Sequence, residues 1–162
     1  MKKIAIILFF IHFCIYSQET ISYENIYKEN NLVYNSLTKK LFSGIAQGFK
    51  KSNHLSFEME FEKGILKTTT QYYKGKEKRI AEIKFYLEDG KIYKKLKYSF
   101  DRTYTWTVHY DLNETKILEE EHENEVLKYY CEFLNGKKNG KEVCVKENGL
   151  IIENFYENGK LK

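Results

Sequence analysis

The sequence predicts an all-β protein in which successive hairpins form one antiparallel meander. Three observations lead to this prediction. Runs of strand length alternate apolar and polar residues with a period of two, glycines in polar turns recur every 10 to 15 residues, and the 162-residue chain has no proline. Connections this short leave no room for a parallel crossover, so each strand must pair with its predecessor. The expected product is an elongated, twisted sheet.

The first 17 residues have the layout of a secretory signal peptide. Lys2 and Lys3 precede an apolar run from Ile4 to Tyr16, and the small residue Ser17 closes it. A membrane span needs about 20 apolar residues, so this run is too short to be one. We therefore expect the leader to be removed, no transmembrane segment to remain, and the mature protein to be periplasmic or extracellular.

Residues 18–33 are expected to form a separate N-terminal segment ahead of a β-meander domain at 34–162. Within "ENIYKENN", Ile26 and Tyr27 follow Tyr23 at the three- and four-residue spacing of a helix, so this stretch could make a helical turn or two. No other part of the mature chain indicates a helix.

The strands of the body follow from their alternation. The clearest is "LSFEMEFE" at 55–62, which predicts one buried and one wet face. The same period recurs in "AEIKFYL", "KIYKKLKYSF" and "TYTWTVHY", and Asn-Gly or Asp-Gly pairs supply the turns between many strands. The acidic run at 119–125 lacks the glycine of a calcium loop, so we interpret it as a solvated hairpin turn.

The end of the chain resembles a known family of repeats. "FLNGKKNGKEVCVKENGLIIENFYENGKLK", residues 133–162, is similar to the degenerate MORN-type repeats of YwqK-family antitoxin-like proteins, and "YNSLTKKLFSGIAQGF", residues 34–49, is similar to the segment that often precedes them. Leu41 and Glu142 depart from the pattern, which often has proline and an aromatic residue there. The resemblance implies a MORN-like sheet used for protein or surface contacts, with no common catalytic centre.

Two cysteines of the mature chain, Cys131 and Cys144, are candidates for a disulfide in an exported protein. A turn that sets Asn135 opposite Gly140 would place the cysteines directly opposite each other on adjacent strands, at a distance that a disulfide can bridge. A register shifted by one residue would put them on opposite faces and leave two thiols. Both alternatives remain open at this point.

A candidate binding strip lies in "KIYKKLKY". Lys91, Tyr93, Lys95 and Lys97 are predicted to share one strand face, where lysines beside a tyrosine could meet an acidic partner or anionic head groups. The alternative is a solvated strand face that resists aggregation. Without Lys2 and Lys3 the formal net charge falls from +4 to +2, with both signs spread along the chain, so nucleic acid is not an expected partner.

No catalytic or metal signature is present in the sequence. It has neither the Cys-x-x-Cys spacing of a zinc site nor a Gly-x-Ser-x-Gly nucleophile motif, so we expect no enzyme, no metal and no cofactor. The leading hypothesis is an exported, non-catalytic β-repeat protein that acts by protein–protein interaction. Its partner is unknown; an exported toxin, and hence an immunity or antitoxin-like role, is one version. The alternative is an envelope surface binder of anionic lipid head groups or glycans, in contact with the membrane surface.

Overall fold

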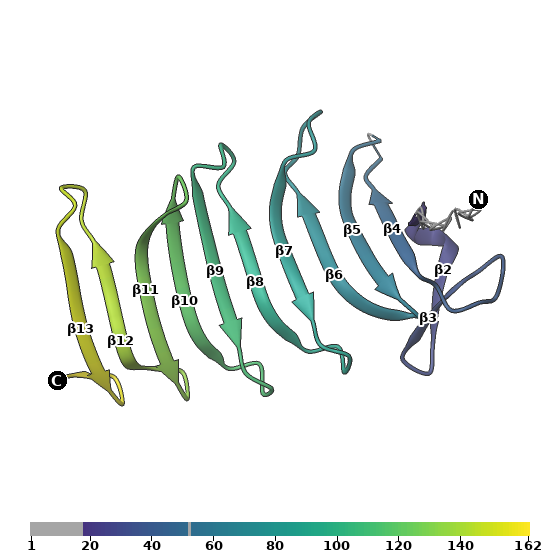
Figure 1. Ribbon diagram of the computed structural model, residues 1–162. Helices are drawn as coiled ribbons and strands as arrows, with labels where there is room; N and C mark the ends of the chain where they lie inside the picture. Colours follow the sequence, from purple (N-terminus) through teal and green to yellow (C-terminus); the bar gives the residue numbers. More distant parts are fainter. Residues whose placement is uncertain (1–17, 52) are drawn as a thin grey trace, which may run out of the picture.

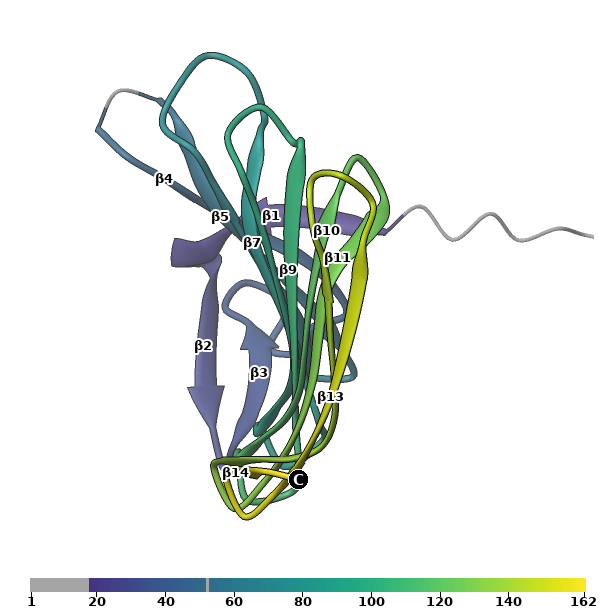
Figure 2. The ribbon, with the colours of Figure 1, turned by 90° about the vertical axis from the view of Figure 1, so that its left-hand side faces the viewer.

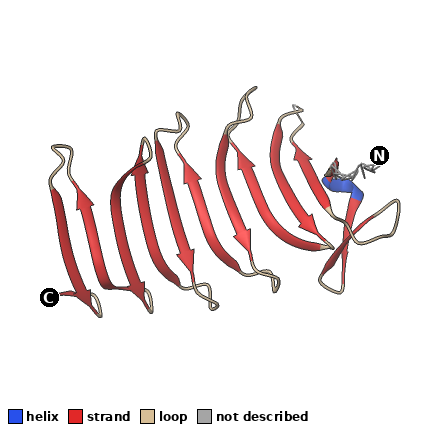
Figure 3. Ribbon diagram, in the orientation of Figure 1, coloured by secondary structure: helices blue, strands red, loops and turns tan. Residues whose placement is uncertain are grey.

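A computed structural model describes residues 18–51 and 53–162. Figure 1 shows one long, open sheet that is not closed into a barrel. Twelve strands form it in the order β1-β4-β5-β6-β7-β8-β9-β10-β11-β12-β13-β14, and β2 and β3 form a separate hairpin. From β5 onward every strand pairs antiparallel with its predecessor, which confirms the predicted all-β meander (Figure 3). The predicted signal peptide lies outside the described residues.

The bounds of the strands are as follows: β1 Glu19–Ser22, β2 Ile26–Glu29, β3 Leu32–Asn35, β4 Gly44–Phe49, β5 Leu55–Glu62, β6 Ile65–Tyr72, β7 Ile80–Tyr86, β8 Ile92–Tyr98, β9 Tyr104–Tyr110, β10 Lys116–Glu123, β11 Val126–Leu134, β12 Lys137–Val145, β13 Ile151–Glu157 and β14 Lys160–Leu161.

The N-terminal segment is mostly strand. Its only described helical element is the 3-10 turn Tyr23–Asn25, so the expected helical turns shrink to this one. The next residues form β2, which turns back into β3 through Asn30 and Asn31, both with positive φ (48° and 64°). Two such residues make the tight turn that matches the twist of a hairpin, and asparagine tolerates this conformation better than most residues. The hairpin turn thus overrides the helical spacing.

The strand β1 is an exception to the antiparallel rule. It pairs in parallel with β4, with Glu19 opposite Gly44 and Ser22 opposite Gln47. The connection between them contains the whole β2–β3 hairpin, and this length is what a parallel crossover requires. The short connections of the meander do not permit the same arrangement elsewhere.

The core sits at the N-terminal end, where the hairpin packs on one face of the sheet (Figure 2). Its buried residues are Val33, Phe42, Ala46 and Phe61. Backbone hydrogen bonds fix the hairpin in place, since the Val33 amide donates to the Gly64 carbonyl at 2.9 Å. Beyond β6 no described segment covers either face of the sheet, which continues as a single layer (Figure 2).

We call the face on which the hairpin lies the hairpin face. Directly opposed residues carry it across the sheet in one row, from Ile21 through Ala46, Met59, Thr69, Lys84, Lys95, Val108, Glu119, Cys131 and Glu142 to Asn154. The row is apolar from Ile21 to Met59, under the hairpin, and most of its members from Lys84 onward are charged or polar. Within residues 18–51 and 53–162, no helix has the length and apolar character of a membrane span.

The acidic run is not a turn, contrary to our interpretation of the sequence. Its first five residues, Glu119 to Glu123, belong to β10, and only Asn124 and Glu125 form the turn, with φ of 48° and 67°. The run pairs on both sides, with β9 and with β11. Strand pairing on two edges therefore outweighs the repulsion among neighbouring carboxylates, which alternate between the two faces.

Candidate functional site

The charged part of the hairpin face, from β7 to β13, contains two groups of side chains that could act together. One surrounds Glu142 on β12, and the other consists of lysines on β7 and β8. The first is a closed polar cluster, whereas the second borders a hollow.

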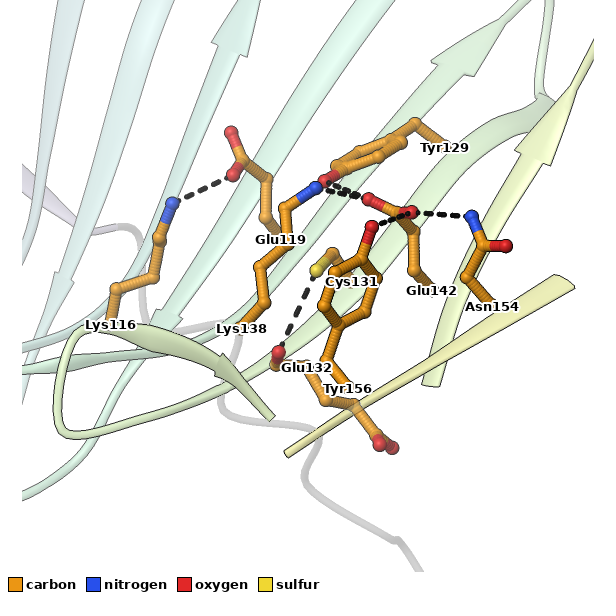
Figure 4. Close-up of polar contacts among 9 residues, drawn as sticks. All are labelled: Lys116, Glu119, Tyr129, Cys131, Glu132, Lys138, Glu142, Asn154 and Tyr156. Carbon is orange, nitrogen blue, oxygen red and sulfur yellow. Dashed lines mark hydrogen bonds and ion pairs between the residues drawn. The ribbon is translucent and has the colours of Figure 1, made fainter. Parts of the chain in front are cut away.

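The cluster around Glu142 joins three strands (Figure 4). Glu142 is only 4% exposed. It forms an ion pair with Lys138, accepts a hydrogen bond from the Asn154 side-chain amide at 2.9 Å, and accepts hydroxyl hydrogen bonds from Tyr156 at 3.2 Å and Tyr129 at 3.3 Å. A charge this buried is stable only when its hydrogen bonds are satisfied, as they are here.

An irregularity in the strand pairing creates this cluster. Cys131 pairs with Glu142, but Phe133, two residues later, pairs with Lys138, four residues earlier. The extra residues of β12 bring the side chains of Lys138 and Glu142 together on the hairpin face. This is the kind of re-aiming that β-bulges produce.

The electrostatics of the cluster keep each group in its ordinary charge state at neutral pH. The hydrogen bonds from Lys138 and Asn154 lower the pKa of Glu142 to about 2, and Glu142 in turn raises the pKa of Lys138. Burial raises the pKa of Tyr129 and of the Cys131 thiol. None of these groups is poised to exchange a proton near pH 7, as a general acid or base would be.

The two cysteines lie on the same face but are not opposed. Cys131 faces Glu142 and Cys144 faces Tyr129, so both predicted registers are wrong and the cysteines are diagonal neighbours. Both are free thiols. The turn of this hairpin consists of Asn135 and Gly136 alone, with φ of 51° and 74°, and the later Asn-Gly pair belongs to β12. A turn placed earlier shifts the register and separates the cysteines.

The predicted binding strip is divided by a bulge. Lys95 and Lys97 lie on the hairpin face, but the register shifts beside Tyr93, whose ring packs against Phe85 on the opposite face, 6.1 Å between centroids. Lys91 lies in the turn before β8 and donates to the Leu112 carbonyl at 2.9 Å. The prediction that all four residues share one face is therefore wrong, because an extra residue in β8 reverses the alternation.

A third lysine, which the sequence reasoning missed, joins Lys95 and Lys97. Lys84 lies directly opposite Lys95, and Glu82 lies directly opposite Lys97. The carboxylate of Glu82 is 3.3 Å from the Lys84 ammonium and 3.9 Å from that of Lys97. In the part of the chain that the structure describes, no carboxylate forms an ion pair with Lys95. Pairing "AEIKFYL" with "KIYKKLKY" across the Asp-Gly turn would have been the signal for this group.

Lys95 and Lys97 border a hollow of about 440 Å³, and Lys84 lies directly opposite Lys95 on the neighbouring strand. Lys95 and Lys97 form one side, and their opposed neighbours on β9, Val108 and Trp106, form the floor. Glu119 closes the far side. We call the group of Lys84, Lys95, Lys97, Trp106 and Val108 the lysine groove.

Neighbouring side chains on the same face contact Trp106, the aromatic residue of the lysine groove. Trp106 stacks against Tyr104, with centroids 5.9 Å apart and planes at 23°. Glu121 lies directly opposite Trp106 on β10. Burial, and then the charge of Glu119, raise the pKa of the Glu121 carboxyl, while a hydrogen bond with Trp106 lowers it in part.

Comparison with known proteins adds no relative. The chain matches no protein-family model, and no curated protein matches it. Among residues 18–51 and 53–162, no group of three or more His, Cys, Asp or Glu side chains is arranged to hold a metal ion.

Proposed function

We propose that this protein is an exported, non-catalytic β-repeat protein of MORN type that acts by protein–protein interaction. The observation that carries the proposal is the uncovered sheet. Beyond β6 neither face is covered by another described segment, and large apolar side chains such as Ile151 and Phe155 are more than half exposed. Aromatic side chains that stay exposed on an uncovered sheet are of the type that protein interfaces favour.

The connections and polar contacts between the strands of the sheet support the same function. Its strands are joined by tight turns, and polar networks such as the Glu142 cluster fix neighbouring strands to one another. A preformed surface binds without first paying the conformational entropy of ordering itself. The closed state of the Glu142 cluster, with no group near its titration point, favours a structural role for it over a catalytic one.

The partner class follows from the expected location. With the leader at residues 1–17 removed after export, the partner is an exported protein, and a secreted toxin bound by an immunity-type protein is the version that the antitoxin-like resemblance supports. Tyrosine and tryptophan on the hairpin face, such as Tyr104 and Trp106, are residues that protein interfaces favour.

A second candidate function is an envelope binder of anionic lipid head groups or glycans. The surplus of lysine over carboxylate around Glu82 favours it. The neighbouring carboxylates Glu119 and Glu121 weigh against a flat anionic surface, because they lie on the same face and would be pressed against it.

The test uses the mature protein, residues 18–162, as bait in the native envelope fraction. A recovered partner is purified separately and the complex is reconstituted. Its molar mass is then measured by size-exclusion chromatography with light scattering. Val108→Asp on the hairpin face and His109→Asp on the opposite face introduce the same residue at adjacent positions. We expect a stoichiometric complex that one of these variants abolishes and the other retains. Failure to reconstitute any complex would overturn the proposal.

A further inference from the structure

We propose that the lysine groove binds an acidic, extended segment of a partner polypeptide. This inference rests on the proposed function and names the partner's chemistry. It is argued from the charge surplus, the shape of the hollow and the charges around it.

The first step is the charge surplus. Lys84 and Lys95 are directly opposed on adjacent strands, an arrangement that destabilises a sheet when the two charges are alike. The ammonium groups of Lys84 and Lys97 share the single carboxylate of Glu82, at 3.3 Å and 3.9 Å, and that of Lys95 forms no ion pair within the described residues. A carboxylate from outside would offset this repulsion, so the groove is complementary to an acidic ligand.

The second step is the shape. The hollow of about 440 Å³ lies beside the lysines, and its apolar lining includes Val108 on the floor and Ala81 on the wall. The register shift between β6 and β7 leaves Ala81 as an extra residue of β7, and its small side chain lines the hollow together with Lys97. The groove therefore accepts an apolar side chain next to a carboxylate, the combination that an acidic peptide segment supplies.

The third step distinguishes a polypeptide from the other anionic ligands. A bilayer surface would also press on Glu119 and Glu121, and three lysines fall short of the clusters of about four to eight that bind acidic lipids. Tyr104 stacks on one face of Trp106, which reduces the aromatic surface that a sugar ring could use there. A narrow, extended chain can contact the lysines while meeting one acidic residue of the lining, Glu119, whose carboxylate already pairs with Lys116 at 2.8 Å.

The experiment uses the only tryptophan of the chain, Trp106, which lies in the groove itself. The mature protein is titrated with poly-L-glutamate while tryptophan fluorescence is followed. We expect a saturable change whose apparent affinity falls at least about tenfold between 50 and 300 mM salt, because the screening length shortens from about 14 Å to about 6 Å over this range. No response of Trp106 to poly-L-glutamate would overturn the inference.

Matched charge-reversal variants test the location. K95E/K97E should lose at least about tenfold in apparent affinity for poly-L-glutamate, because two attractive contacts become repulsive. K137E/K160E makes the same change in net charge outside the groove and should retain the wild-type affinity within about twofold. Equal losses in both variants would overturn the inference, since they would reflect net charge alone. If K95E/K97E does not fold, K95Q/K97Q replaces it, with K137Q/K160Q as its control.

Two further ligands separate the classes. Vesicles rich in phosphatidylglycerol and the acidic polysaccharide polygalacturonate are titrated in the same way. A Trp106 response to either one that exceeds the response to poly-L-glutamate would overturn the inference in favour of a lipid or glycan site. A reconstituted protein complex that K95E/K97E does not weaken would overturn the groove as the binding site but leave the proposed function standing. Binding of poly-L-glutamate without any reconstituted protein complex would support the groove and overturn the proposed function.

Discussion

Cys131 lies directly opposite Glu142, so its diagonal neighbour Cys144 is not its partner across the strands. Diagonal neighbours have Cα atoms about 7–8 Å apart, beyond the usual span of a disulfide. We expect the mature protein, unfolded without reductant, to show two titratable thiols per chain with Ellman's reagent. In the folded protein, alkylation near pH 7 should be slow, because burial raises the pKa of both thiols. A Cys131–Cys144 peptide in non-reducing mass spectrometry would contradict the register.

The Glu142 cluster should stabilise the C-terminal strands. Glu142→Gln removes the charge that Lys138 pairs with and should lower the free energy of unfolding by about 1–3 kcal/mol, as measured by urea denaturation. Glu153→Gln is the matched control, because Glu153 forms an exposed ion pair with Lys141 on the opposite face. Such pairs contribute about 1 kcal/mol or less. Equal effects of the two variants would show that the cluster carries no special weight.

The Glu142 carboxyl also predicts that the stability of the protein depends on pH in the acidic range. The pKa of Glu142 is lowered from 4.5 to about 2 in the folded protein. The stabilisation from its charged form is therefore complete above about pH 4.5 and is lost as the pH falls toward 2. Wild-type stability should drop through this window more steeply than that of Glu142→Gln. Parallel stability curves for the two proteins between pH 5 and 2 would refute the assignment.

The Glu121 carboxyl predicts a pH dependence of stability with the opposite sign. Its pKa is raised, first by burial and then by the charge of Glu119, so the folded state disfavours the charged form. This cost is absent below the ordinary glutamate pKa of 4.5 and is complete above the raised folded value. Glu121→Gln should thus be more stable than wild type at pH 7, and the difference should vanish in acid. Glu120→Gln on the opposite face is the control, and equal stabilisation by both would argue for a general effect of negative charge.

Gly48 and Phe57 form a directly opposed pair near the core. A Cβ on Gly48 would lie 2.2 Å from two carbons of the Phe57 ring, and that ring is also held edge-on by Tyr23. Gly48→Ala should therefore destabilise the protein by about 1–3 kcal/mol through overpacking. In a Phe57→Ala background the same substitution should cost little, which a double-mutant cycle measures. Additive effects would mean that the two residues do not interact.

The period-two alternation in the sequence was enough to predict the meander. In a strand the side chain points to one face or the other according to its parity, so "LSFEMEFE" and its counterparts define strands without reference to their neighbours. The turn pairs also act locally, as Asn135-Gly136 shows, since positive φ is a property of the residue itself. These features of the fold depend on local chemistry, which is written in the sequence.

The register and the sites depend on more than local chemistry. Choosing between two nearby Asn-Gly pairs moved Cys131 and Cys144 out of opposition, and one extra residue in β8 turned Tyr93 away from Lys95. Such bulges arise from the sum of many cross-strand contacts, and a shift of one residue reverses every face. Alternation and turn chemistry thus made this chain a sheet of hairpins. Which side chains meet on it, such as Lys84 with Lys95, was settled when whole strands packed against one another.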